Sequence, residues 1–194
     1  MDDTHLKIMK AAMDLVTEKG YDSMTTKEIA RRAGVNESTL FRKFKGKEDI
    51  IVTAMDYEPW RPHISKEMFK NYKGEPAIDL FNFARIYLDN VTPYFVSLSI
   101  GLRSPELYKY TSQKIMQVPQ TFLACIKSYL FDMQNQGKIR VQNIEAVAAM
   151  FLSMCFGFVF FKASFKDDLI AIQTDDYIKT GIEVLLDGIQ LEPV

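Results

Sequence analysis

Seven lysine and arginine side chains lie close together between Thr25 and Lys47, in a chain that is otherwise acidic. They are Lys27, Arg31, Arg32, Arg42, Lys43, Lys45 and Lys47. Only two acids, Glu28 and Glu37, share this window, which gives it a net charge of +5; the remaining residues carry 17 bases and 23 acids, a net charge of −6. Concentrated cations on an acidic body favour a polyanionic partner, and a solvated basic surface is the alternative for the charges considered alone.

Two short helices joined at a glycine are expected to carry these cations. Thr25 or Thr26 can cap the first helix, with Glu28 placed to complete a capping box. Gly34 then ends it, because glycine tolerates the left-handed conformation. Asn36 can cap the second helix, residues 37–44. The pattern predicts a helix, a tight turn and a helix of about two turns.

The second of these helices has one apolar side and one polar side. Its helical period places Leu40 and Phe44 together, with Lys43 at the edge of the opposite side. The polar side carries Ser38, Thr39 and Arg42. Hydroxyls and cations can hydrogen-bond base edges and phosphates. This arrangement is typical of a helix-turn-helix, whose second helix enters the DNA major groove.

A further helix, expected at about residues 47–58, begins directly after this segment. Lys45 and Lys47 lie at its start, where free N–H groups and the helix dipole favour an anion. We therefore expect a DNA phosphate to bind there.

The segment MTTKEIARRAGVNESTLFRKFKGKEDII, residues 24–51, resembles the TetR family of bacterial transcriptional regulators, and the close match covers about residues 5–52. Carried over by position, the resemblance implies that DNA is contacted by Thr26, Lys27, Ser38, Thr39, Phe41, Arg42, Lys43 and Lys47. The family most often has tyrosine at the position of Phe41, whose ring has no hydroxyl for a phosphate. A packing role for Phe41 therefore stays open.

The remaining chain is predicted to be helical, so the fold class is all-α. Helices are expected near residues 76–92, 93–102, 105–136 with Pro119 as a kink, 143–165 and 175–189, and no useful strand alternation occurs. We expect a helix-turn-helix DNA-binding domain over residues 1–50, with the helix at 47–58 as a linker. Residues 51–194 are expected to form a helical domain that binds an effector and dimerises.

Methionines and aromatic residues are abundant in this second domain. A packed core is the ordinary explanation for them, but as a set they can also line an adaptable apolar pocket. The resemblance implies a small-molecule effector, here apolar or aromatic. The candidate lining residues are Trp60, Phe83, Tyr87, Met116, Phe122 and Cys125.

The last two expected helices suggest a homodimer. Residues 143–165 are apolar nearly all round, and residues 175–189 provide a facing apolar stripe. The resemblance implies that these helices pair with their copies in a four-helix bundle. A two-fold dimer presents two recognition helices about 34 Å apart and reads a palindromic operator in double-stranded DNA. Two core helices of a monomer are the alternative.

Several other classes of function are disfavoured. The apolar run 146–161 is shorter than the ~20 residues of a spanning helix, and the start of the chain lacks a secretory pattern, so we expect a cytoplasmic protein without a membrane segment. Cys125 and Cys155 show no metal-ligand spacing, and we expect no metal or other cofactor. The two histidines, His5 and His63, are far apart and no catalytic motif is present, so we expect no catalytic residues.

The sequence thus predicts a ligand-responsive transcriptional regulator, more specifically a repressor that its effector releases from DNA. A helical small-molecule-binding protein with only nonspecific DNA binding is the alternative.

Overall fold

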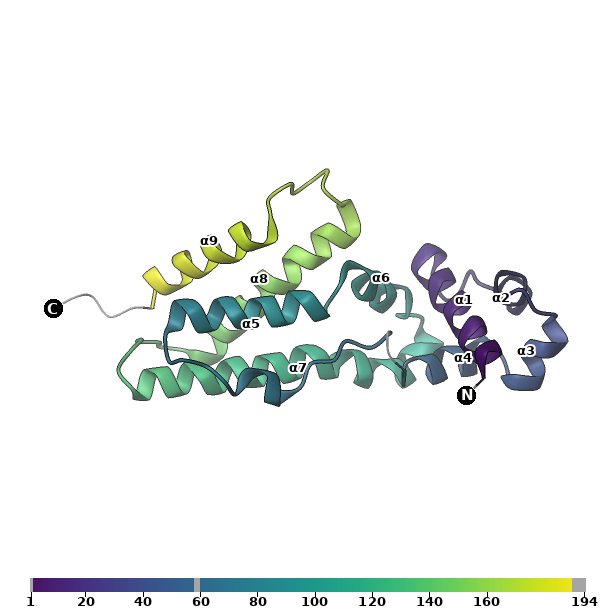
Figure 1. Cartoon of the computed structure of the whole chain (residues 1–194), viewed down its shortest axis with the longest axis horizontal. Helices are drawn as coiled ribbons and strands as arrows, with labels where there is room; N and C mark the ends of the chain where they lie inside the picture. The colour runs from purple at the N-terminus through teal and green to yellow at the C-terminus, as the bar shows by residue number, and fades with distance from the viewer. Residues whose placement is uncertain (1, 58–59, 190–194) are drawn as a thin grey trace. The chain divides into compact units, whose positions relative to one another are not determined.

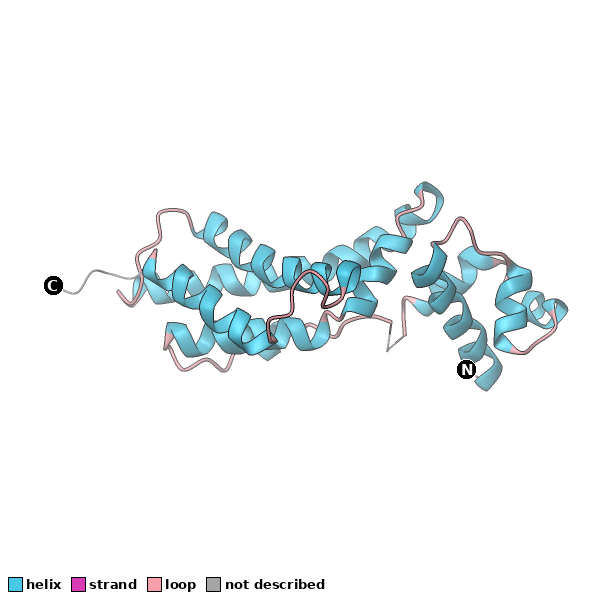
Figure 2. Cartoon of the chain, turned by 90° about the horizontal axis from the view of Figure 1, so that it is seen from above, coloured by secondary structure: helices cyan, strands magenta, loops and turns pink. Residues whose placement is uncertain are grey.

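The computed structural model describes residues 2–57 and 60–189, which form helices joined by loops (Figures 1 and 2). The helices are α1 (Asp3–Lys19), α2 (Thr26–Ala33), α3 (Glu37–Lys43), α4 (Lys47–Ala54), the 3-10 helix η1 (Lys66–Phe69), α5 (Pro76–Asn90), α6 (Pro93–Gly101), α7 (Pro105–Asn135), α8 (Ile144–Phe165) and α9 (Thr174–Asp187). No strand occurs in these described residues, which confirms the all-α prediction.

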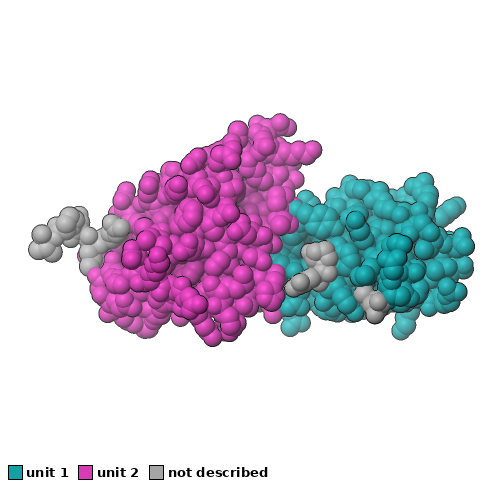
Figure 3. Space-filling view, in the orientation of Figure 1, with its two compact units in different colours: residues 1–62, 94–116 teal, residues 63–93, 117–194 magenta. Residues whose placement is uncertain are grey.

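The chain divides into two compact units (Figure 3). The first contains the described residues up to Pro62 together with Tyr94–Met116, and the second contains His63–Pro93 and the described residues from Gln117 onward. Besides α1, α2 and α3, the first unit therefore includes α4, α6 and the beginning of α7. The sequence-based division at residue 50 stays a prediction.

The first unit is built around α1, whose buried side packs against α2 and α4. Its core also takes in Leu98, Leu102 and Leu107, from α6 and the residues that follow it. Gly101 permits α6 to approach α1 closely, since a Cβ atom at this position would lie 2.6 Å from the carbonyl oxygen of Val16. The end of α6 is thus fitted against the end of α1 within one core.

The second unit has an aromatic core with one buried carboxylate. Tyr87 and Phe122 are buried with their ring centroids 4.5 Å apart. Asp79, near the start of α5, is only 1% exposed; it accepts hydrogen bonds from the backbone N–H groups of Lys73 and Glu75 and from the Tyr129 hydroxyl. Burial and the Asp79 carboxylate together raise the pKa of Tyr129. These bonds fix the segment that leads into α5.

Helix α4 ends earlier than the sequence predicts. The expected helix reached residue 58, but α4 ends at Ala54. The N–H groups of Asp56 and Tyr57 donate to the carbonyls three residues before them, those of Thr53 and Ala54, so the chain tightens into turns. The last residue of the expected helix, 58, lies outside the described residues.

Helix α8 is apolar on several sides and only partly covered. Within the described part of the chain it is the one helix long and apolar enough, by length and composition, to cross a membrane, yet most of its apolar window is not buried. Met150 on α8 is 62% exposed and Val184 on α9 is 71% exposed. An apolar surface of this kind on a protein usually marks an interface.

Candidate nucleic-acid interface

The turn between α2 and α3 has the predicted construction. Thr25 accepts a hydrogen bond from the backbone of Glu28, and Glu28 accepts from the backbone of Thr25, so the capping box is confirmed. Gly34 has φ 69° and ends α2 in the left-handed conformation, as predicted. The cap expected from Asn36 is wrong: Asn36 occupies the N-cap position of α3, but its side chain accepts no capping hydrogen bond. The glycine turn and the buried side of α3, not an Asn36 cap, therefore contribute to the position of α3 after α2.

Helix α3 presents the expected polar side outward. Leu40 and Phe44 are buried in the core of the first unit, whereas Ser38 and Arg42 are exposed and Thr39 is half-buried. Phe41 is 53% exposed, so its ring is available on the surface rather than packed in the core. The exposed surface of α3 thus combines two hydroxyls, one cation and one aromatic ring.

The start of α2 lies beside the start of α3. The Thr26 hydroxyl donates to the Glu37 carboxylate over 2.6 Å, which joins the first residues of the two helices. Lys27, the next residue of α2, is exposed. An exposed cation therefore stands close to the first turn of α3.

Besides Thr26, two lysines among the eight predicted contact residues are already engaged within the chain. The Lys43 ammonium pairs with the Asp2 carboxylate at 2.6 Å, and only 16% of the Lys43 side chain is exposed. Its hydrogen bond, followed by that of His5, holds the pKa of Asp2 far below the usual range. Lys47 donates to the backbone carbonyls of the loop between α1 and α2. For both lysines, DNA contact stays a prediction.

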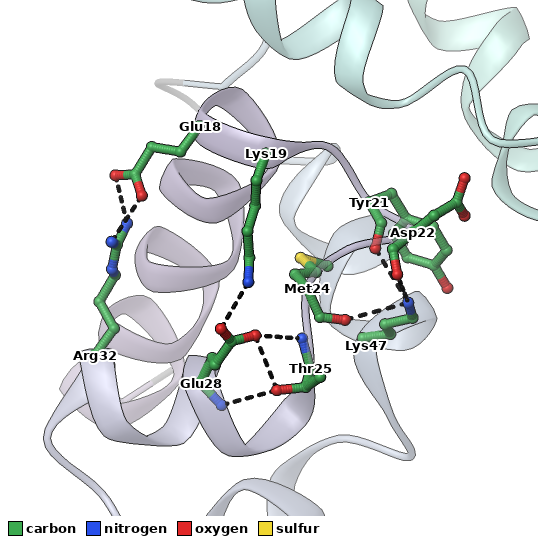
Figure 4. A network of polar contacts seen from close by, with 9 residues as sticks. All are labelled: Glu18, Lys19, Tyr21, Asp22, Met24, Thr25, Glu28, Arg32 and Lys47. Atoms are coloured by element: carbon green, nitrogen blue, oxygen red, sulfur yellow. Dashed lines mark hydrogen bonds and ion pairs between the residues drawn. The ribbon is translucent and has the colours of Figure 1, made fainter.

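The other bases of the cluster also differ in their surroundings (Figure 4). Arg32 makes two hydrogen bonds, of 2.6 and 2.7 Å, to the carboxylate of Glu18 on α1. Arg31, Arg42 and Lys45 are exposed, like Lys27. The charge that can meet a polyanion is consequently smaller and more localised than the count of seven bases indicates.

Sequence reasoning missed the residues that engage these bases. Asp2 is 41 positions from Lys43, and the loop carbonyls are 23 to 26 positions from Lys47. Backbone carbonyls carry no residue-type signal, so only the acidic start of the chain could have pointed to one of these contacts.

The Glu28 carboxylate gives a pH-dependent prediction. Hydrogen bonds from Lys19, and then from Thr25, lower the pKa of Glu28 from 4.5 to about 2. A carboxylate whose pKa is lower in the folded state than in the unfolded state stabilises the fold at pH values above its unfolded pKa. This contribution is lost as the pH falls toward about 2, the pKa of Glu28 in the folded state. Thermal melting from pH 6 to pH 3 is therefore expected to show a smaller decline for Glu28→Gln, which preserves the capping box, than for the original chain.

The control for this measurement is Glu183→Gln, an exposed site on α9. Equal declines for the Glu28→Gln variant and the original chain would contradict a stabilising role for the ionised Glu28.

The six candidate effector residues are not brought together. Trp60 is buried in the core of the first unit, and Met116 is 45% exposed. Phe83, Tyr87 and Phe122 are buried in the second unit, where the rings of Phe83 and Phe122 both contact Phe69. The set is therefore divided between the two units.

A cavity and a groove in the second unit bear on ligand binding and dimerisation. Cys125, which is half-buried, lines a cavity of about 380 Å³ with Phe69, Tyr72 and Tyr129. A larger apolar groove of about 600 Å³ lies between α8 and α9, and Met150 and Val184 belong to its lining. Of the six candidate effector residues, one lines the smaller cavity and none lines the groove, whose lining lies mostly in the two helices expected to dimerise.

Comparison with known proteins gives matches at both ends of the chain. Residues 8–54 match the family described as "Bacterial regulatory proteins, tetR family". Residues 90–188 match the family described as "AefR-like transcriptional repressor, C-terminal domain". The HTH-type transcriptional regulator YvkB of Bacillus subtilis (strain 168) is 26% identical over 99% of this chain and 100% of its own length.

Solved structures show the same fold. NalD, the secondary repressor of the MexAB-OprM multidrug efflux pump in Pseudomonas aeruginosa, has a TM-score of 0.70 at 14% identity, over 98% of this chain and 97% of its own. The fatty acid degradation regulator FadR from Bacillus halodurans has a TM-score of 0.61 at 19% identity, over 97% of each chain. At such identities the likeness concerns the fold alone.

Proposed function

Because this chain belongs to the TetR family of bacterial transcriptional regulators, we propose that it is a homodimeric repressor which reads a palindromic operator and is released by a small-molecule effector. The family consists of helix-turn-helix regulators and not of enzymes, and its members bind DNA and small molecules and dimerise. The operator, the effector and the residues that contact each of them are the new elements of this proposal.

The observation that carries the DNA-binding proposal is the exposed side of α3. Ser38, Thr39 and Arg42 are proposed to meet base edges in the major groove, and Phe41 to contact sugar or a thymine methyl group. Thr26 and Lys27 are proposed to position the helix on phosphates, since both lie at the start of α2. Lys43 is proposed to join them, although its ammonium group is shared with Asp2 in the DNA-free chain.

The groove between α8 and α9 supports dimerisation through these two helices. Its exposed apolar residues, Met150 and Val184 among them, would lose their contact with water against a second copy. Gly157 on α8 supports the same proposal, because a Cβ atom there would meet nothing within 4 Å and the position is free for a partner helix. A two-fold axis between the copies would place two α3 helices about one DNA turn apart.

We place the effector site in the second unit, at the cavity beside Cys125. The lining combines the aromatic rings of Phe69, Tyr72 and Tyr129, which favour an apolar or aromatic compound, with the charged side chains of Lys66, Lys70 and Asp132. Such a ligand would favour the conformer in which it binds more tightly, and release of DNA follows if the two α3 helices of that conformer no longer match the half-sites. The proposed place of action is the cytoplasm.

Selection of bound sequences from random DNA and from host genomic DNA tests this function. At near-physiological salt the purified protein is expected to enrich a palindrome whose half-sites lie about one turn apart. No enrichment by folded, ligand-free protein would leave a helical small-molecule binder with only nonspecific DNA affinity.

A further inference from the structure

We propose that Lys47 is a positioning residue for operator recognition, not a phosphate ligand. This inference rests on the proposed function, because it concerns how the α2–α3 pair is held for reading DNA. The side chain belongs to the first residue of α4, and its ammonium group points into the loop between α1 and α2 (Figure 4).

The ammonium group of Lys47 is fully occupied by this loop. Its Nζ atom lies 3.0 Å from the carbonyl oxygen of Tyr21, 3.4 Å from that of Asp22 and 3.3 Å from that of Met24. It also lies 4.3 Å from the centroid of the Tyr21 ring, within the range of a cation–π contact. An ammonium group has three donors, and three carbonyls accept from it here. A phosphate would have to displace one of them.

The loop that Lys47 holds leads directly into α2. Met24 is buried and is followed by Thr25, the N-cap of α2. The next residue, Thr26, donates to Glu37 at the start of α3. The loop is thereby linked through Thr26, the first residue of α2, to the start of the recognition helix.

The same loop is attached on another side to α6 and to the turn after it. The backbone N–H of Tyr21 donates to the carbonyl of Gly101 over 3.1 Å, and the Ser104 hydroxyl donates to Asp22 over 2.7 Å. Lys47 therefore links α4 to a loop that is also fixed to α6. Without its ammonium group the loop keeps its bonds to α6 and the buried side chains of Tyr21 and Met24, but its carbonyls lose their link to α4, and the start of α2 can shift.

A shift of α2 and α3 and the loss of a phosphate contact have different consequences for DNA binding. Base contacts depend on alignment, so a shift lowers the preference for the operator over other DNA. Affinity for any DNA and its dependence on salt follow the number of phosphates neutralised, with a slope of ~0.9 for each phosphate. The two roles of Lys47 can therefore be separated by measurement.

The test compares Lys47→Met with the matched control Lys45→Met. Methionine keeps the length of the side chain but has no donor and no charge, and Lys45 is an exposed lysine two residues earlier. Affinity is measured for the duplex recovered by selection and for a shuffled duplex of the same composition, between 50 and 200 mM salt. Circular dichroism establishes that each variant is folded at the temperature used.

For Lys47→Met the operator preference is expected to fall by ~10-fold or more, with the salt slope on the shuffled duplex unchanged. For Lys45→Met the preference is expected to stay as in the original chain. Lys47→Gln is the milder variant, since its amide keeps two donors without the charge, and it is expected to recover part of the preference. If Lys47→Met does not fold, Lys47→Gln replaces it in the comparison with Lys45→Met.

A uniform loss on both duplexes with a slope shallower by ~0.9 would overturn the inference and make Lys47 a phosphate ligand. Unchanged binding on both duplexes would overturn it as well, because the carbonyl contacts would then have no effect on recognition. If the original chain itself shows no preference between the duplexes, the proposed function fails first and this inference fails with it.

Discussion

Substitution of Arg42 by alanine is expected to weaken binding to the selected operator by about 1–3 kcal/mol for each half-site, which amounts to ~30-fold or more for the two half-sites together. The guanidinium group is exposed on α3 and presents a planar set of donors, which suits two parallel hydrogen bonds to one guanine. Its removal takes away both the charge and the base reading. The loss is therefore expected to be larger on the operator than on a shuffled duplex.

Arg31→Ala is the matched control for this prediction. Arg31 is an exposed arginine in the last turn of α2, so this variant loses the same charge from the same basic window. Fluorescence anisotropy with both duplexes gives the two affinities. If a folded Arg42→Ala protein bound the operator as tightly as the original chain, the major-groove assignment of α3 would be wrong.

Substitution of Val184 by glutamate is expected to convert the homodimer into monomers at micromolar concentration. Val184 is 71% exposed on α9 and lines the groove between α8 and α9, so a glutamate there stays in water in the single chain. In the proposed dimer the carboxylate would be buried without a partner, at a cost of ~3–5 kcal/mol. That corresponds to ~100-fold or more in the dissociation constant.

Sedimentation velocity over a range of concentrations measures this effect. Phe131→Glu is the control, because Phe131 is also more than half exposed but lies on α7. The Val184→Glu monomer is expected to remain folded, since surface substitutions usually change stability by less than ~0.5 kcal/mol. An intact Val184→Glu dimer would exclude this groove as the dimer interface.

The sequence predicted the local construction of the DNA-binding segment well, because local signals determine it. The capping box of Thr25 and Glu28, the left-handed Gly34 and the buried side of α3 all depend on neighbours within a few residues. The all-α class was also predicted correctly, because helix periodicity and helix ends are local signals too. Asn36 shows the limit of such signals, because a residue type that favours capping does not ensure that the capping bond forms.

Contacts between distant positions were beyond sequence reasoning. The periodicity of a helix gives the direction in which Lys43 and Lys47 leave the backbone, but a long flexible side chain can turn toward any suitable partner nearby. Here those partners are the Asp2 carboxylate and the carbonyls of the loop between α1 and α2. The division of the candidate effector residues between the two units was beyond sequence reasoning for a related reason. Aromatic residues such as Trp60 and Phe122 have the same composition signal whether they line a pocket or fill a core.

The affinity of the purified protein for its selected duplex and for a shuffled duplex, both at about 0.15 M salt, tests the central claim most directly. A sequence-specific dimer that reads bases through α3 is expected to prefer the selected duplex by ~10³-fold or more. Equal affinities that fall together as the salt concentration rises would contradict this account and leave only the electrostatic attraction of a basic surface.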